Sequence, residues 1–239
     1  MLLRRFAQSL VVALVVSAPL SACAGNPDNT GPLPEAAGLV AAAADDLREL
    51  TDVAFELRVS GAIPGLPVRE IEGVADRRDD SARGEVDVQL PDERVQYSFV
   101  LDDDVVRLTD SEGAVVDRPV PAEHAPSDLL DPDHGLRRLL TEATELRTET
   151  REELGDVETY RIGGELSHAA ISALVPGVHD DVDVKFWIAD RGDTLVRVWV
   201  QVPPQKKNEG AVQLELELRE HNRTGSDPGR PAGEPADRP

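Results

Sequence analysis

Cysteine and aromatic residues are scarce in this chain: 239 residues include one cysteine, two tryptophans, two tyrosines and four phenylalanines. A single cysteine excludes an internal disulfide, so packing and hydrogen bonds must hold the fold together. Leu, Val, Ile and Ala must therefore build most of the hydrophobic core. Basic residues are also few, 25 against 46 acidic ones, for a net charge of −21. Because phosphate binding needs a basic surface, nucleic acid is excluded as a partner.

Motifs for catalysis and for cofactors are missing as well. The sequence contains no G-x-S-x-G elbow, no P-loop and no dinucleotide fingerprint. The run Asp102-Asp103-Asp104 fits a solvated turn better than a calcium loop, since no ligand-spaced loop follows it. Five histidines lack metal-ligand spacing and are interpreted as surface or capping residues: His124, His134, His168, His179 and His221. We therefore expect neither an enzyme nor a metal or cofactor site.

The N-terminus has the layout of a bacterial secretion signal. Arg4 and Arg5 precede an apolar run over residues 7–16, which is too short to cross a hydrocarbon core of roughly 30 Å. The run ends in Leu20-Ser21-Ala22-Cys23, which resembles a lipobox. The resemblance implies cleavage before Cys23 and lipid anchoring of that cysteine on the extracytoplasmic face of the plasma membrane. The alternative is an ordinary secretory signal that ends near a chance cysteine.

Composition divides the remaining chain. We expect residues 1–22 to be a removed signal peptide and residues 23–33 to be a lipidated tether, because they are rich in Gly, Asn, Asp and Pro. Residues 34–222 are long enough for one domain with a sizeable core. Residues 223–239 are rich in Pro, Gly, Asp and Arg, which predicts a disordered tail.

Hydrophobic periodicity within 34–222 predicts an α+β domain. Helical spacing is found from Pro34 to Leu50, from Asp133 to Leu146, and in a short helix capped by Ser167 that includes Leu174. Period-two alternation predicts strands at 53–59, 86–90, 95–101, 182–188 and 212–218. Further strands are expected at 68–74, 105–108 and 160–162 and in the Val-rich run 195–202. This order favours a long curved antiparallel sheet with helices on one face.

Several segments together resemble one family, the actinobacterial LppX/LprA/LprF/LprG lipoproteins. After the lipobox, these segments are Val59-Ser60-Gly61 with Gly65-Leu66-Pro67-Val68, then Leu130-Asp131-Pro132-Asp133-His134-Gly135-Leu136, then Thr159-Tyr160-Arg161-Ile162-Gly163-Gly164 with Ala170, and finally Trp187-Ile188, Asp190-Arg191-Gly192-Asp193 and Leu195-Val196-Arg197. Their order along about residues 1–220 carries the resemblance. The chain departs from the family pattern in its high charge and in the acidic turn at 102–104.

The resemblance implies a half-barrel similar to the LolA and LolB carriers, with helices packed on its concave face around an apolar cavity that holds acyl chains. The cavity lining that we expect comes from strands and helices: Tyr97, Phe99, Leu101, Leu136, Leu139, Leu140, Ile171, Leu174, Val184, Phe186, Val198, Leu214 and Leu216. The alternative for any one of these residues is simple core packing. Trp187 and Trp199 could lie at the mouth of the cavity or on the outer face.

The expected function is a membrane-anchored, monomeric lipoprotein that carries acyl lipids or glycolipids across the cell envelope and receives them from a membrane exporter. Two alternatives remain open from the sequence, a lipid-responsive sensor of a membrane partner and a structural envelope protein without a pocket. An enzyme is a third, which the absence of a nucleophile constellation disfavours.

Overall fold

A computed structural model describes residues 31–63, 65–102, 105–119, 129–131, 133, 135–175, 177–204 and 210–222. The chain divides into two units, Met1–Gly31 and Pro32–Pro239, and the second holds every described helix and strand. The predicted lipidation site Cys23 and the predicted tail 223–239 lie outside the described residues. No helix in the described part is long and apolar enough to cross a membrane.

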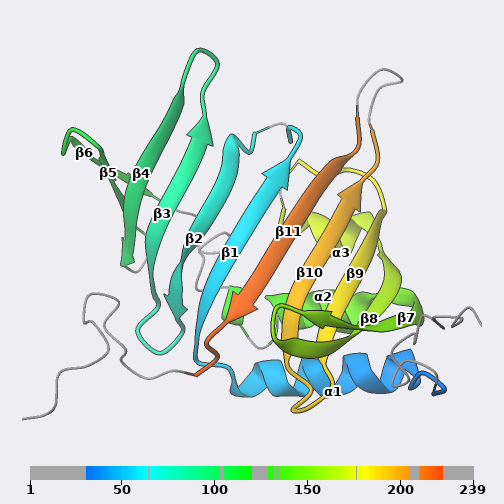
Figure 1. Ribbon diagram of the computed structural model, residues 1–239. Coiled ribbons are helices and arrows are strands. Elements are labelled where there is room, and N and C mark those ends of the chain that lie inside the picture. Colours follow the sequence, from blue (N-terminus) through cyan, green and yellow to red (C-terminus); the bar gives the residue numbers. More distant parts are fainter. Residues whose placement is uncertain are drawn as a thin grey trace, which may run out of the picture. The chain divides into compact units, whose positions relative to one another are not determined.

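A single antiparallel sheet of eleven strands dominates the second unit (Figure 1). The first six strands are β1 (Asp52–Ser60), β2 (Val68–Asp76), β3 (Ser81–Gln89), β4 (Arg94–Asp102), β5 (Val105–Asp110) and β6 (Val115–Pro119). The other five are β7 (Thr144–Leu154), β8 (Val157–Leu166), β9 (Val182–Ala189), β10 (Leu195–Val202) and β11 (Val212–Arg219).

The sheet consists of two meanders joined at its centre. Its strand order is β6-β5-β4-β3-β2-β1-β11-β10-β9-β8-β7, so the first strand of the domain pairs with the last. In the described part of the chain the edge strands β6 and β7 do not pair with each other. The sheet is therefore curved but unclosed, which confirms the coarse fold prediction.

Among the described residues, three helices accompany the sheet: α1 (Ala36–Glu49), α2 (Leu136–Glu142) and α3 (His168–Ser172). The Glu35 carboxylate caps α1 by accepting hydrogen bonds from the backbone N–H groups of Ala37 and Gly38. Helix α1 packs against β7, β9 and α2, and α2 packs against α3. Figure 1 shows all three helices beside the β7–β11 half of the sheet.

Some element predictions were wrong. The helix predicted to run from Asp133 to Leu146 spans only Leu136–Glu142, and Leu146 belongs to strand β7. The short helix α3 ends at Ser172, so Leu174 lies in the turn after it. Strands β6 and β7 were not expected at all.

Candidate functional site

The two faces of the sheet differ sharply in chemistry. Cross-strand register aligns one apolar row from β11 to β6 through Leu218, Phe55, Gly73, Gly84, Phe99, Leu108 and Val116. The hydrophobic core lies on this side, which is called the inner face below. Residues one position away along each strand point to the opposite, outer face, because successive side chains in a strand alternate.

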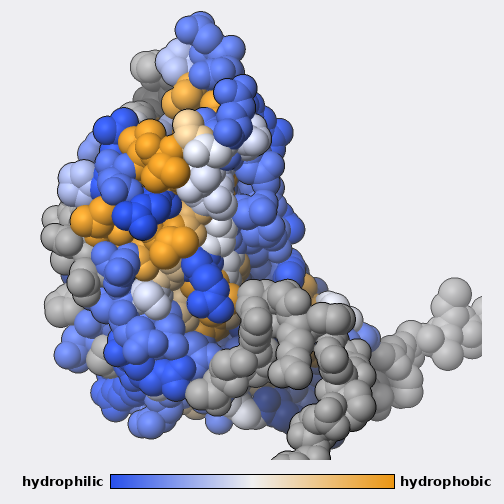
Figure 2. Space-filling model, turned by 90° about the vertical axis from the view of Figure 1, so that its left-hand side faces the viewer, coloured by the Kyte–Doolittle hydropathy of each residue, from blue (hydrophilic) through white to orange (hydrophobic). Residues whose placement is uncertain are grey.

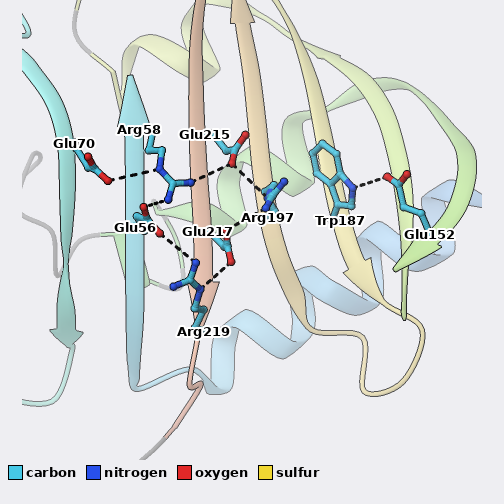
Figure 3. A network of polar contacts seen from close by, with 9 residues as sticks. All are labelled: Glu56, Arg58, Glu70, Glu152, Trp187, Arg197, Glu215, Glu217 and Arg219. Atoms are coloured by element: carbon cyan, nitrogen blue, oxygen red, sulfur yellow. Dashed lines mark hydrogen bonds and ion pairs between the residues drawn. The ribbon is translucent and has the colours of Figure 1, made fainter. Parts of the chain in front are cut away.

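The outer face carries a network of ion pairs (Figure 3). Arg58 on β1 lies 3.6 Å from a Glu70 oxygen on β2 and 3.7 Å from a Glu215 oxygen on β11. Arg219 joins Glu56 at 3.1 Å to Glu217 at 2.8 Å. Hydrogen bonds from Arg219, and then from Arg197, hold the pKa of Glu217 below its ordinary value. Alternating charge thus compensates the acidic residues that crowd these strands.

Trp187 and Trp199 belong to this outer face. The Trp187 indole N–H donates a hydrogen bond of 2.8 Å to Glu152, and the Arg197 guanidinium lies 5.7 Å from the centroid of the Trp187 ring. Lys185 lies 5.9 Å from the centroid of Trp199. Of the two positions left open by the sequence, the structure places both tryptophans in outer-face packing.

The inner face is closely packed where the helices lie. Phe186 and Ile188 on β9 are fully buried, as are Ile162 and Leu195 on the neighbouring strands. The predicted cavity residues in this half are at most 8% exposed, apart from the partly buried Leu174: Leu136, Leu139, Leu140, Ile171, Val184, Phe186, Val198, Leu214 and Leu216. They belong to one core cluster, so the structure brings these residues together.

The predicted residues on β4 lie in the other half. Phe99 and Leu101 are buried in the same cluster, and Tyr97 is half-buried against it. In the sheet order β3, β2 and β1 separate β4 from β11. Tyr97 and the predicted residues on α2 and α3 therefore share a face of the sheet but occupy different halves of it.

Partly exposed apolar side chains gather on the inner face of the first meander. They come from five neighbouring strands, β1 to β5, and are Leu57, Val68, Ile71, Val88, Tyr97, Val106 and Leu108. This set is called the open face below. Ile71 pairs with Leu57 on one side and with the buried Val86 on the other, and Val86 pairs with Tyr97, so the set is continuous across the strands.

Of the open face, the candidate list included only Tyr97. Strand alternation indicated that Leu57 and Val88 point to the apolar side. Which strands the helices leave uncovered depends on tertiary packing, and the sequence carries no local signal for it.

A pocket of about 270 Å³ is formed by residues on or next to β8, β9 and β10: Glu165, Asp181, Val182, Asp183, Gln201 and Pro203. Its three carboxylates distinguish it from the apolar cavity that was expected. Among the described residues no group of three or more His, Cys, Asp or Glu side chains could hold a metal ion.

Sequence comparison finds relatives that are named lipoarabinomannan carrier proteins. The lipoarabinomannan carrier protein LprG of Mycolicibacterium hassiacum is 30% identical over 207 residues, covering 84% of this chain and 89% of that protein. The protein of the same name from Mycobacterium tuberculosis is 28% identical over 193 residues, covering 80% of this chain and 82% of that protein.

Solved structures have the same fold. LprF from Mycobacterium bovis matches with a TM-score of 0.69 at 20% identity, over 84% of this chain and 99% of that one. The lipoprotein LppX from Mycobacterium tuberculosis matches with a TM-score of 0.61 at 20% identity, over 78% and 94%. The sequence model of the LppX_LprAFG lipoprotein family matches residues 35–222. The chain therefore belongs to the LppX_LprAFG lipoprotein family.

Proposed function

We propose that this protein is a lipid carrier of the cell envelope that shields the acyl chains of a lipid or glycolipid against its open face. The single observation that carries the proposal is a continuous apolar surface, from Leu57 on β1 to Leu108 on β5, which remains partly exposed beside a tightly packed core. A soluble domain gains nothing from such a surface unless another apolar group covers it.

The energetics favour an acyl chain as that group. Hiding methylene groups from water yields about 0.8 kcal/mol each, so a chain of about 16 carbons gains on the order of 10 kcal/mol. Binding of this kind needs shape and apolar area and no reacting group, and we propose a function without catalysis or cofactor. The relatives named lipoarabinomannan carrier proteins support a glycolipid as the cargo.

The mechanism follows from the two halves of the sheet. The packed half, under α1 to α3, holds the strands in place, and the open face receives the acyl chains while the polar headgroup stays in water. A lipid anchor on Cys23 would keep the carrier at the plasma membrane, where an exporter would deliver its cargo. The charged outer face keeps the loaded protein soluble.

Native mass spectrometry tests the proposal. The chain from residue 24 onward, which contains every described helix and strand, is expressed in an actinobacterial host and its lipids are extracted. We expect bound acyl lipid at a defined stoichiometry. A mass without lipid, unchanged after incubation with envelope lipids of the host, would contradict the proposal.

A matched pair of variants locates the binding surface. Ile71 on β2 points to the inner face, and the next residue, Glu72, is exposed on the outer face. Ile71→Trp fills the open face and should abolish most of the bound lipid, whereas Glu72→Trp should leave it unchanged. Equal occupancy in the two variants, both folded by circular dichroism, would show that the lipid binds elsewhere.

A further inference from the structure

Exposed large hydrophobic side chains are concentrated at one edge of the sheet. In the described part of the chain five such residues stand out, and all except Leu33 lie on β4, β5 or β6. They are Val100 at 53%, Val105 at 40%, Val115 at 55% and Val116 at 40% exposure. These four residues are called the valine edge below. The opposite edge strand, β7, carries none of them.

Val116 of the valine edge continues the open face to the last strand, and the other three valines lie around the rim on the outer face. Val116 on β6 pairs with Leu108 on β5, and Leu108 pairs with Phe99 on β4, so Val116 extends the apolar inner row to the last strand. Val115, one position earlier, points to the outer face, and so do Val100 and Val105, which neighbour the inward Leu101 and Val106 on β4 and β5. Figure 2 shows apolar side chains gathered on this side of the molecule, next to the hydrophilic outer face.

The edge strand β6 is poorly suited to pair with a strand of another molecule. Strand β6 has only five residues, and its last three are Asp117, Arg118 and Pro119. Charged residues and proline on a short edge strand oppose the addition of a further strand, because proline cannot donate a backbone hydrogen bond. The side chains of the valine edge are thus available for contact while its backbone resists strand pairing.

Charge indicates what kind of surface can cover the valine edge. Arg107 and Asp117 neutralise each other through an ion pair of 3.0 Å between β5 and β6. Residues 105–119 otherwise contribute Asp110, Glu112 and Arg118, so they hold no basic cluster that could attract anionic lipid headgroups. The whole chain has a net charge of −21 and would be repelled by an anionic surface. A surface that binds the valine edge must therefore be apolar and carry no negative charge.

We propose that the valine edge docks on the interface of a lipid bilayer and so brings the open face to the membrane for the transfer of acyl chains. This inference rests on the proposed lipid-carrier function and adds the route by which cargo enters and leaves. An acyl chain that slides from the bilayer past Val116 onto Leu108 remains on apolar surface throughout, which lowers the cost of transfer through water.

Vesicle flotation tests the docking surface. The chain from residue 24 onward, which carries no lipid anchor, is mixed with vesicles of phosphatidylcholine and centrifuged through a density gradient. The wild-type protein should float with the vesicles, and the Val115→Ser/Val116→Ser variant should bind about tenfold more weakly, since two half-exposed valines lose their apolar contact. The matched control, Leu33→Ser, removes an aliphatic side chain of 41% exposure away from the valine edge and should bind like the wild type.

Two further measurements distinguish apolar docking from other causes of flotation. Raising the salt concentration should leave binding to phosphatidylcholine unchanged, and replacing half of the lipid with phosphatidylglycerol should weaken it. Binding that requires phosphatidylglycerol, equal flotation of the wild type and the double variant, or no flotation of the wild type would overturn the proposal. Light scattering that shows a dimer for the wild type and a monomer for the double variant would also overturn the proposal, because the valine edge would then join two copies of the chain.

Lipid occupancy distinguishes failure of this inference from failure of the proposed function. Both substituted valines are exposed, so the double variant should retain the wild-type amount of bound lipid in native mass spectrometry while it loses vesicle binding. Normal occupancy combined with normal flotation of the variant would refute the docking surface alone. A wild-type protein that never binds lipid would refute the carrier function.

Discussion

Gly73 on β2 and Gly84 on β3 face each other across the sheet so closely that a β-carbon on Gly84 would lie 2.6 Å from the Gly73 α-carbon. In the same inner row Phe55 flanks Gly73 and Phe99 flanks Gly84. Backbone can approach backbone in this way only where both side chains are missing. The glycine pair therefore marks a close approach of two strands that lies directly beside the open face.

Gly84→Ala should destabilise the domain by about 2 kcal/mol, because the added methyl group meets backbone that cannot rotate away. Urea unfolding followed by circular dichroism measures the loss. The matched control is Gly210→Ala, where a β-carbon would meet no atom within 4 Å. Equal stability of the two variants would mean that the approach of β2 to β3 is not tight in solution.

Asn222 fastens the end of the domain to the start of β1. Its side-chain oxygen accepts hydrogen bonds from the Thr51 backbone N–H at 2.7 Å and from the Thr51 hydroxyl at 3.0 Å, and its amide donates to the Glu49 carbonyl. Asn222→Ala should cost about 1–2 kcal/mol of unfolding free energy. Asn222→Asp keeps the oxygen that accepts from Thr51 and puts a carboxylate oxygen in place of the amide donor to the Glu49 carbonyl, so it retains the two Thr51 bonds and its loss should be smaller than that of Asn222→Ala. The reverse order, measured by thermal unfolding, would contradict this role.

Arg219 on the outer face neutralises two carboxylates that are largely buried. The side chains of Glu56 and Glu217 are only 10% and 16% exposed. Arg219→Gln should therefore destabilise the protein by about 1–2 kcal/mol, since it leaves both charges without this partner. Arg107→Gln is the control, because its partner Asp117 is 51% exposed, and it should change stability by less than about 0.5 kcal/mol.

The same ion pairs predict a loss of stability in acid. The pKa of Glu217 is lower in the folded protein than its ordinary value of 4.5, so the folded state binds fewer protons. The stabilisation is fully present above that value and is lost as the pH falls through the lowered pKa. Glu217→Gln should flatten this part of the stability curve, and a curve of unchanged slope would contradict the prediction.

His221 predicts a second, milder dependence on pH. Burial lowers the pKa of its imidazole from the ordinary value of 6.5, and the Asp46 carboxylate on α1 offsets only part of that effect. The folded state therefore favours the neutral ring, so this contribution is complete above about pH 6.5 and declines as the pH falls below it. His221→Gln should reduce the decline between pH 7.5 and pH 5.5. If the wild type instead became more stable as the pH fell from 7.5 to 5.5, and the variant did not, the folded protein would favour the charged imidazole and the prediction would be wrong.

Much of the fold could be predicted because most strands alternate between apolar and polar residues. In β9 the alternation already grouped Trp187 with Asp183 and Lys185, which is the outer face on which it lies. Strand β7 was not predicted because its sequence, TELRTETREEL, has little apolar alternation and is rich in residues that favour helices. Pairing with β8 overrides that local preference.

The candidate site was harder to predict for a different reason. Burial in the core and exposure on the open face require the same kind of residue: Val184 and Val88 are both inward valines, but Val184 is 1% exposed and Val88 is half-buried. Val184 lies in the half of the sheet beside which the three helices are found, where α1 packs against β9 and β7, whereas Val88 lies in the other half (Figure 1). No local pattern encodes that choice, so the sequence predicted an apolar face without locating its open part.

Photo-cross-linking tests the central claim most directly. A phospholipid with a diazirine near the end of one acyl chain is bound to the chain from residue 24 onward, irradiated, and its attachment sites are mapped by peptide mass spectrometry. The open face predicts cross-links at Ile71, Val88, Tyr97 and Leu108. Cross-links confined to outer-face positions such as Glu72, or to the helices α2 and α3, would contradict the proposal that the uncovered half of the inner face holds the lipid.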